Sequence, residues 1–317
     1  GNLAKVYQFS RRRTPLIYFL RDSMWAAGKW KSSALLEWAE SFHPDVIFFA
    51  AGDYAFSYRV TLSLAQYLQV PVVMWCADDY YLSPPVSPFR RLQCRRLRKL
   101  ARQVVRQSGA VVTISDKMGT DYARFFDVPV ETVRISSDPN PYALPATQRT
   151  GIVYAGNLGL NRIAPLVELG RALRQAALPG FSAIDVYSGE QRPAVLRQIT
   201  EENGLHYCGR ISASEVERLL GRSKFLVFTE SFDDKSVRRV KYSLSTKISE
   251  SLRSGACLLA YGSPQIASIE YLRRHNAARI LRSADELPAA LLELCSSHDT
   301  YAKYVRAAQE LAEQCHN

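Results

Sequence analysis

The residues best suited to chemistry lie in the segment 241–264, KYSLSTKISESLRSGACLLAYGSP. We expect a short helix here, with Thr246 as its N-cap and Gly255 as its end, followed by a buried strand CLLA and a turn. Lys247 would then occupy the first helical position, and Glu250 would follow one turn later on the same face. A lysine at the positive end of a helix dipole costs about 0.3 to 1 kcal/mol unless an anion binds there.

Two interpretations of this helix remain open from the segment alone. In the first, free backbone N–H groups and the Lys247 ammonium form a phosphate site, and Glu250 accepts hydrogen bonds from two hydroxyl groups of a ribose. In the second, the helix lies on the surface and Lys247 and Glu250 form a solvated ion pair. The segment favours the two interpretations about equally.

A second cation stands at the start of another predicted helix. The strand GIVYAG runs into the loop NLGLNR, which contains Gly156 and Gly159, and a helix follows from Ile163 to Ala177. This layout is typical of a turn that surrounds a phosphate, although the full GxGxxG spacing is absent and ordinary strand-to-helix turns also use glycine. Arg162 at the start of this helix parallels Lys247, and one shared anionic ligand would explain both cations.

The elements that must position these residues alternate between helix and strand, which predicts parallel sheets with ligands at the C-terminal ends of the strands. Helices are expected over 32–42, 56–68, 87–109, 115–126, 163–177, 193–203, 212–223, 284–296 and 299–314. Strands are expected over 45–50, 70–77, 110–115, 130–135, 151–156, 182–189, 206–209, 224–228 and 257–260.

Acidic residues follow two of the predicted strands in the first half. Gly52 and Asp53 follow the strand 45–50, and Asp78 and Asp79 follow the next strand. The two adjacent aspartates could bind an acceptor, hold a metal ion or cap a turn. A metal is the least favoured of these, because no histidine or further carboxylate lies close in the sequence. We therefore predict no metal site.

The most basic segment is 87–109, SPFRRLQCRRLRKLARQVVRQSG. Its apolar residues recur at helical spacing and include Phe89, Leu92, Leu97, Leu100 and Val104. Such a helix can dock an apolar stripe on its own domain and expose arginines to lipid phosphates, each worth about 1 kcal/mol near an anionic membrane. A well-solvated helix that faces the core is an equal alternative. Nucleic acid is disfavoured, because no aromatic residues interleave with the arginines.

Composition excludes several classes of protein. The chain has 317 residues, 47% hydrophobic and 22% charged, which is enough for two globular domains. Its apolar runs fall short of the roughly 20 residues of a membrane span, and the N-terminal segment has no apolar core typical of a signal peptide. Six scattered cysteines without a CxxC pair predict neither disulfides nor zinc, and favour a reducing cytoplasm. The net charge of +11 favours an anionic partner.

The domain boundary is expected in the segment 136–150, SSDPNPYALPATQRT, because turn-forming residues are frequent there. We predict an acceptor-side Rossmann-like domain over 1–140, a nucleotide-sugar domain over 150–295 and a C-terminal helix over 296–317. The first thirty residues do not open with the strand and glycine-rich loop usual for such a domain. We therefore expect the first domain to be incomplete at its N-terminus.

The second half resembles the donor domain of the retaining GT-B glycosyltransferases, a family (glycosyl transferases group 1, or family four) that includes many enzymes of bacterial surface polysaccharides. The resemblance rests on VYAGNLGLNR, HYCGRISASEVERLL, FTESFDDKSV and YSLSTKISESLRSGACLLAYGSPQIASIEYL, over about 150 residues. GDY, ADDYYL and TISDKM in the first half resemble the acceptor domain more loosely. The implied fold is α/β, with two Rossmann-like domains that face each other across a cleft.

The resemblance also implies roles for individual residues. Those implied to lie at the donor diphosphate are Gly156, Asn157, Gly159, Arg162, Thr246 and Lys247, with Lys247 and Arg162 as the catalytic cations. Glu250 would bind the ribose. The segment 207–210 would contact the base through Tyr207, Gly209 and Arg210. Ser231, Phe232 and Asp233 would lie near the transferred sugar, and Gly52, Asp53, Asp78 and Asp79 near the acceptor.

The implied reaction moves a sugar from a nucleoside-diphosphate sugar to a saccharide or polyprenyl-linked acceptor, with retention of configuration. It requires no cofactor and no metal, because cations at helix N-termini can stabilise the leaving diphosphate. The chain departs from the family at Asn157, where an arginine is common, and at Tyr242, where a glutamate is common. Two rival functions remain: a nucleotide-sugar epimerase of the same fold, and a basic module that binds membrane or nucleic acid through a degenerate site. We expect a cytoplasmic protein at the inner face of the cell membrane.

Overall fold

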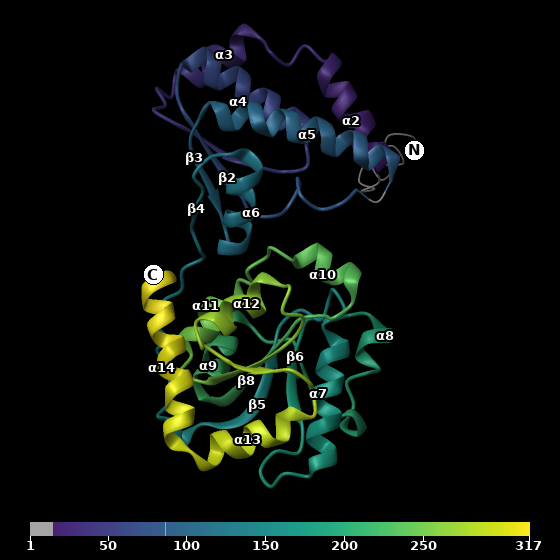
Figure 1. Cartoon of the computed structure of the whole chain (residues 1–317), viewed down its shortest axis with the longest axis vertical. Helices are drawn as coiled ribbons and strands as arrows, with labels where there is room; N and C mark the ends of the chain where they lie inside the picture. The colour runs from purple at the N-terminus through teal and green to yellow at the C-terminus, as the bar shows by residue number, and fades with distance from the viewer. Residues whose placement is uncertain (1–14, 86) are drawn as a thin grey trace. The chain divides into compact units, whose positions relative to one another are not determined.

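The computed structural model describes residues 15–85 and 87–317, and the N-terminal segment predicted to lack a signal peptide lies outside them. The chain divides into two compact units, the first ending at Val133 and the second beginning at Arg134. Each unit contains one sheet of parallel strands with helices packed on it (Figure 1). The predicted α/β class with two Rossmann-like domains is therefore confirmed.

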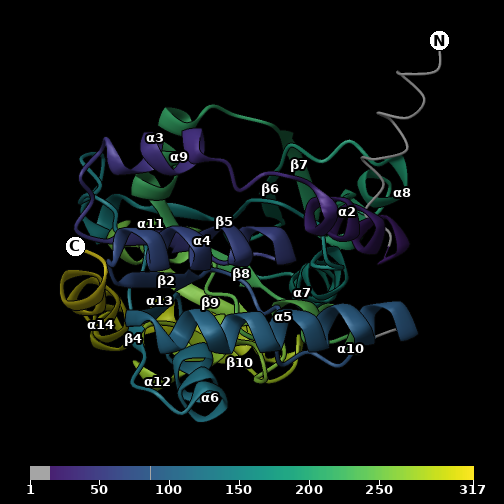
Figure 2. The same ribbon diagram turned by 90° about the horizontal axis from the view of Figure 1, so that it is seen from above.

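The first unit carries a four-stranded sheet in the order β1-β2-β3-β4. Its elements are α2 (Pro15–Ala27), α3 (Ser33–Glu40), β1 (Ile47–Ala50), α4 (Ala55–Leu68), β2 (Val72–Cys76), α5 (Pro88–Arg106), β3 (Ser108–Thr113), α6 (Asp116–Phe126) and β4 (Glu131–Thr132). Helices α4 and α5 lie side by side (Figure 2), and α5 also contacts α2, β2 and β3.

Helix α5 forms where the sequence predicts it, but its buried face is different. Ser87 caps the N-terminus by accepting a hydrogen bond from the Arg90 N–H group, and a proline opens the first turn. Leu97 and Val104 are buried, as expected, whereas Phe89 and Leu92 are each 51% exposed. The predicted apolar stripe is therefore wrong in its N-terminal half, where Gln93 and Cys94 form the buried face that continues through Leu97 and Val104.

The second unit carries a six-stranded sheet in the order β10-β9-β8-β5-β6-β7, with every pairing parallel. Its elements are η1 (Ala146–Gln148), β5 (Thr150–Ala155), α7 (Ile163–Ala176), β6 (Ile184–Tyr187), α8 (Pro193–Leu196), η2 (Glu201–Asn203), β7 (Leu205–Gly209), α9 (Ala213–Arg222), β8 (Ser223–Thr229), α10 (Asp234–Val240), α11 (Lys247–Arg253), β9 (Cys257–Tyr261), α12 (Ala267–Arg274), β10 (Arg279–Leu281), α13 (Glu286–Ser296) and α14 (His298–Cys315).

The strand order places a topological switch point between β5 and β8. The chain winds from β5 outward through β6 to β7, and then returns to β8 and winds the other way to β10. Central strands of such a sheet are covered on both faces, and β8 and β9 are accordingly apolar and almost fully buried. Ligands of doubly wound sheets bind in the crevice beyond the C-terminal ends of the strands at the switch point.

Several local expectations differ from the structure. The helix predicted over 193–203 is broken into α8 and η2, because the Thr200 side chain accepts a hydrogen bond from the Asn203 N–H group and starts a new turn. Helices α2, α10 and α12 were not predicted, and the strand expected over 130–135 is reduced to β4. The segment 136–150, expected to be a linker, is part of the second unit, where the Leu144 N–H group donates to the Gly221 carbonyl.

Within residues 15–85 and 87–317, no helix combines the length and the apolar character that crossing a membrane requires.

Candidate functional site

The Lys247 side chain lies directly over Gly156 at the C-terminal end of β5. Its Nζ atom is 3.4 Å from the Ala155 carbonyl oxygen and 5.2 Å from the centre of the Tyr154 ring. A Cβ atom added to Gly156 would lie only 1.8 Å from that Nζ atom. Position 156 therefore accepts only glycine while Lys247 keeps this position, which explains the glycine at the start of the NLGLNR loop.

Burial above all, together with the nearby Arg162 guanidinium, lowers the pKa of Lys247 to about 8, whereas Glu230 and Glu250 oppose the shift. The ammonium is thus held in a place where its charge is poorly compensated. An anionic ligand beside it would relieve this cost, since an opposite charge favours the protonated form.

Arg162 has a partner that the sequence did not identify. Its guanidinium donates from Nε and from one terminal nitrogen to the two carboxylate oxygens of Glu230, each at 3.0 Å. The Glu230 side chain is 3% exposed, so this is a nearly buried bidentate pair. The pair bridges the loop after β5 and the end of β8, across the switch point. The position of Arg162 is therefore explained by Glu230 without a shared ligand. The Arg162 guanidinium still adds positive potential near Lys247.

Helix α11 begins at Lys247 as predicted, and Gly255 follows its end with a φ of +75°, in the left-handed region that glycine favours. Thr246 occupies the N-cap position as expected, but its backbone is helical and its side chain makes no capping hydrogen bond. The preceding turn, in which the Ile248 N–H group donates to the Ser245 carbonyl, already continues into the helix.

A cavity of about 260 Å³ adjoins Lys247 at this end of the sheet. Its lining includes Gly156, Ser188, Gly189, Arg210, Lys247 and Glu250. Glu250 is exposed and shares the cavity with Lys247, as expected for residues one turn apart on the same face. A cation and a carboxylate therefore line one hollow, which suits a ligand that carries both an anionic group and hydroxyl groups.

The segment after β7 borders the same cavity. Arg210 contributes to the lining, and the Tyr207 hydroxyl donates a hydrogen bond to the Ser188 carbonyl at 2.9 Å. Gly209 adopts a φ of +78°, which lets the chain turn at the end of the strand. The structure thus brings Tyr207, Gly209 and Arg210 to the loop that carries Ser188.

A second cavity of about 400 Å³ shares Ser188 and Gly189 with the first. It is also lined by Asn157, Gly159 and Arg192. The Asn157 side-chain oxygen accepts a hydrogen bond from the Gly159 N–H group, so these two predicted site residues shape one turn. The sequence analysis did not predict Arg192 at this cavity, because Arg192 lies outside the segments that resemble the glycosyltransferase family.

Ser231 and Asp233 form a local network rather than an open acid–base pair. Asp233 is the N-cap of α10 and accepts hydrogen bonds from the Ser231 hydroxyl at 2.5 Å, the Ser236 N–H group at 2.9 Å and the Asn161 amide at 3.3 Å. These bonds, the one from Ser231 above all, hold the pKa of Asp233 well below its usual range. Phe232 is exposed, and its ring packs against Tyr261.

The predicted acceptor-side residues lie in the first unit at the ends of β1 and β2, which are paired in parallel. Asp79 accepts hydrogen bonds from three backbone N–H groups, those of residues 81–83, and from the Ser83 and Tyr122 hydroxyls. Its contacts are those of a turn-capping residue, one of the alternatives for this position. Asp78 is exposed.

The other two acceptor-side residues are engaged within the same unit. Asp53 lies 3.6 Å from the Arg90 guanidinium, and its carbonyl oxygen accepts a hydrogen bond from the Gln93 amide. The Gly52 carbonyl oxygen accepts one from the Tyr58 hydroxyl. These contacts tie the loop after β1 to α4 and α5.

Comparisons with known proteins give matches among solved structures only: no protein-family model matches the sequence, and no curated protein matches it. HepE from Anabaena, in complex with UDP, is 16% identical with a TM-score of 0.65, over 89% of this chain and 77% of HepE. A glycosyltransferase from Rickettsia africae is 12% identical with a TM-score of 0.64, over 97% of this chain and 79% of that chain.

A putative UDP-N-acetylglucosamine 2-epimerase from Listeria monocytogenes is also similar, with 12% identity and a TM-score of 0.55, over 96% of this chain and 78% of that chain. At identities this low the similarity shows the fold. That fold is the GT-B architecture of two Rossmann-like units, as predicted.

Proposed function

We propose that the chain is a glycosyltransferase that takes its sugar from a nucleoside-diphosphate sugar. The observation that carries this proposal is the partly buried Lys247 ammonium over Gly156, beside a cavity that is also lined by Glu250. This cavity adjoins the switch point, where doubly wound sheets bind nucleotides. HepE, which has the same fold, was solved with UDP and with UDP-glucose, and this supports the choice of ligand.

In this proposal Lys247 binds the diphosphate and stabilises the negative charge that it gains as the sugar leaves. Arg162 contributes positive potential while Glu230 fixes its position. Glu250 accepts hydrogen bonds from the ribose hydroxyls, and the segment 207–210 contacts the base. Electrostatic stabilisation by fixed cations would replace a metal ion in this role. Asp233 is an N-cap and accepts several hydrogen bonds, so we assign it no proton transfer.

We further propose that the sugar is transferred with retention to a saccharide or lipid-linked acceptor, in the synthesis of a cell-surface polysaccharide. The resemblance of the segments around Lys247 to retaining enzymes supports this assignment. In that mechanism the donor phosphate helps to deprotonate the acceptor hydroxyl, so no dedicated protein nucleophile is expected.

Incubation with a panel of nucleotide sugars tests the proposed reaction. We expect slow release of a nucleoside diphosphate from at least one donor, faster when a suitable acceptor is added, and strongly reduced in Lys247→Ala. Conversion of the donor to an epimeric sugar would identify an epimerase, the activity in the name of the Listeria neighbour. Absence of both products across the panel would reject the enzymatic proposal.

We also propose that the first unit binds an anionic membrane surface through α2 and α5. Exposed apolar side chains on these two contacting helices include Leu16, Leu20, Met24, Phe89 and Leu92. A cavity of about 440 Å³ adjoins them, lined by the apolar Phe19 and Leu92 and by the cationic Arg95, Arg96 and Lys99. Apolar side chains flanked by cations suit an interface with anionic lipids.

Vesicle sedimentation tests the membrane proposal. We expect the protein to bind anionic vesicles, but not neutral ones, with an affinity that falls as salt is raised. Changing Arg95, Arg96 and Lys99 to glutamate should abolish binding. The matched control changes three exposed arginines of the second unit, Arg197, Arg273 and Arg274, to glutamate and should bind like the wild type. Equal loss in both triple variants would indicate a general charge effect and refute a defined surface.

A further inference from the structure

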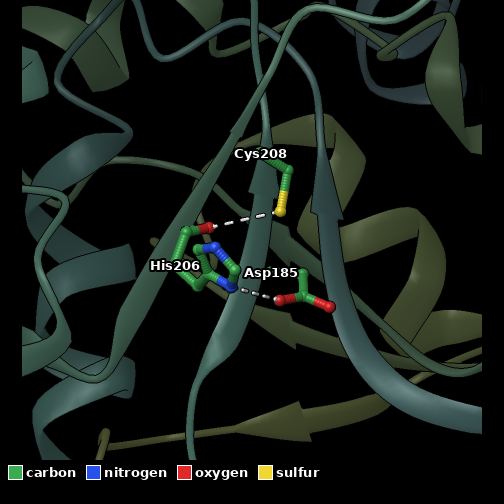
Figure 3. Close-up of side chains that lie close together, drawn as sticks. All are labelled: Asp185, His206 and Cys208. Atoms are coloured by element: carbon green, nitrogen blue, oxygen red, sulfur yellow. Dashed lines mark hydrogen bonds and ion pairs between the residues drawn. The ribbon is translucent and has the colours of Figure 1, made fainter.

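Three side chains of different metal-binding types meet on the neighbouring strands β6 and β7, outside the lining of the nucleotide cavity. They are Asp185 from β6 and His206 and Cys208 from β7 (Figure 3). One ligand atom of each, a carboxylate oxygen, a ring nitrogen and the sulfur, lies within 4.8 Å of the other two. These are the three side-chain donor types that proteins use to bind Zn²⁺.

The sheet itself creates this proximity. Asp185 pairs with His206 in the parallel register of β6 and β7, so their side chains are neighbours. The register then shifts by one residue, because Val186 pairs with Tyr207 and Tyr187 with Gly209, which leaves Cys208 as the extra residue of a bulge. A bulge redirects the side chain that it carries. Backbone pairing, rather than a flexible loop, therefore positions the three groups.

The spacing of the ligand atoms suits a tetrahedral ion. Bonds of about 2.0 to 2.3 Å to Zn²⁺ place two ligands of a tetrahedron about 3.4 to 3.6 Å apart. The His206 Nδ1 atom lies 3.4 Å from the nearer Asp185 carboxylate oxygen. The Cys208 sulfur lies within 4.8 Å of both atoms and must approach them by roughly 1 Å to complete the set.

The site is open to ions from solution, because the side chains of His206 and Asp185 are 59% and 42% exposed. The Cys208 thiol meanwhile points at the His206 carbonyl oxygen, 3.7 Å from the sulfur.

We propose that Asp185, His206 and Cys208 bind one Zn²⁺ ion, with water at the fourth position. Binding replaces the thiol proton by the metal: the Cys208 S–H bond breaks, the sulfur lone pair forms the S–Zn bond and the proton passes to solvent. The ion joins β6 to β7, the edge strand, just before the residues that line the nucleotide cavity. This site does not depend on the proposed function, and it replaces the sequence-based expectation of no zinc.

Titration with Zn²⁺ by calorimetry tests the site on the whole chain. We expect one ion per chain, and an affinity at least tenfold weaker in both Cys208→Ser and His206→Ala. The matched control is Cys295→Ser, which removes an exposed free cysteine of α13 and should leave the affinity unchanged. Circular dichroism of each variant establishes that it is folded, and Asp185→Asn provides a conservative third variant that should also weaken binding.

Co²⁺ provides an independent spectroscopic readout of the same site. The wild type and Cys295→Ser should show the charge-transfer absorption of a Co²⁺–thiolate bond, and Cys208→Ser should lack it. The proposal is overturned if the wild type binds no Zn²⁺, if the folded Cys208 and His206 variants bind it as well as the wild type does, or if bound Co²⁺ shows no thiolate absorption.

Discussion

Substitution of Gly156 by alanine should disrupt donor binding through Lys247. The added Cβ atom would lie 1.8 Å from Nζ and 2.8 Å from the neighbouring Cε atom of the lysine. Because carbon and nitrogen atoms in contact need roughly 3.5 Å, the ammonium must retreat by about 2 Å. Gly156→Ala therefore perturbs the proposed cation without removing its charge.

The expected loss follows from the distance. An ammonium about 3 Å from a singly charged phosphate oxygen that moves to about 5 Å loses about 2 kcal/mol at an effective dielectric constant of about 20. That free energy corresponds to an affinity roughly 30-fold weaker. Calorimetry with UDP measures it directly. Gly189→Ala is the matched control, because Gly189 lines the same cavity and its added Cβ would make only an ordinary contact, 3.4 Å from Arg210 Cδ.

A double-mutant cycle separates this effect from backbone strain at Gly156. In a Lys247→Ala background the obstructing ammonium is gone, so adding Gly156→Ala should weaken UDP binding little further. If Gly156→Ala costs the same free energy in both backgrounds, the glycine acts through its own backbone and the assigned contact with Lys247 is wrong.

Three further predictions concern the same site. Because the pKa of Lys247 is lowered to about 8, its charge is lost as the pH rises through that value, so UDP affinity should be constant near pH 7 and fall by roughly tenfold per pH unit above 8. Lys247→Arg should bind UDP with little change up to pH 9.5, and a flat profile in the wild type would contradict the pKa assignment. Glu250→Gln should weaken binding of UDP by about tenfold, since an amide replaces the charge-assisted bonds to ribose poorly, and equal affinities in calorimetry would leave Glu250 without a ligand role. Glu230→Ala should lower the free energy of unfolding by about 3 to 5 kcal/mol in chemical denaturation, because it leaves Arg162 without its nearly buried partner. Glu293→Ala, which breaks an ion pair with Arg279 in which the Glu293 side chain is 47% exposed, should cost less than about 1 kcal/mol. Similar costs for the two substitutions would show that burial does not matter here.

The sequence was informative wherever a property depends on neighbours along the chain. The alternation of apolar segments predicted the strands of both sheets except β10, and the helix with Lys247 and Glu250 on one face follows from a spacing of three residues. Gly255 could be placed as a helix stop because left-handed backbone favours glycine there. Local chemistry of this kind is visible without a structure.

Contacts between distant segments were not predictable in the same way. Arg162 and Glu230 are 68 residues apart and meet only because β5 and β8 are paired. Asp185 reaches His206 and Cys208 only through the pairing of β6 with β7. Phe89 and Leu92 are exposed because the face of α5 that is buried passes through Gln93 and Cys94, and the choice between these faces depends on neighbouring elements rather than on helical periodicity.

Titration of the wild type and of Lys247→Ala with UDP tests the central claim most directly. The proposal predicts that the wild type binds one UDP per chain, and that the folded Lys247→Ala variant binds it at least tenfold more weakly, because the diphosphate loses its partly buried cation. Absence of UDP binding in the wild type, or equal affinity in the two proteins, would contradict the assignment of this cavity as the donor site.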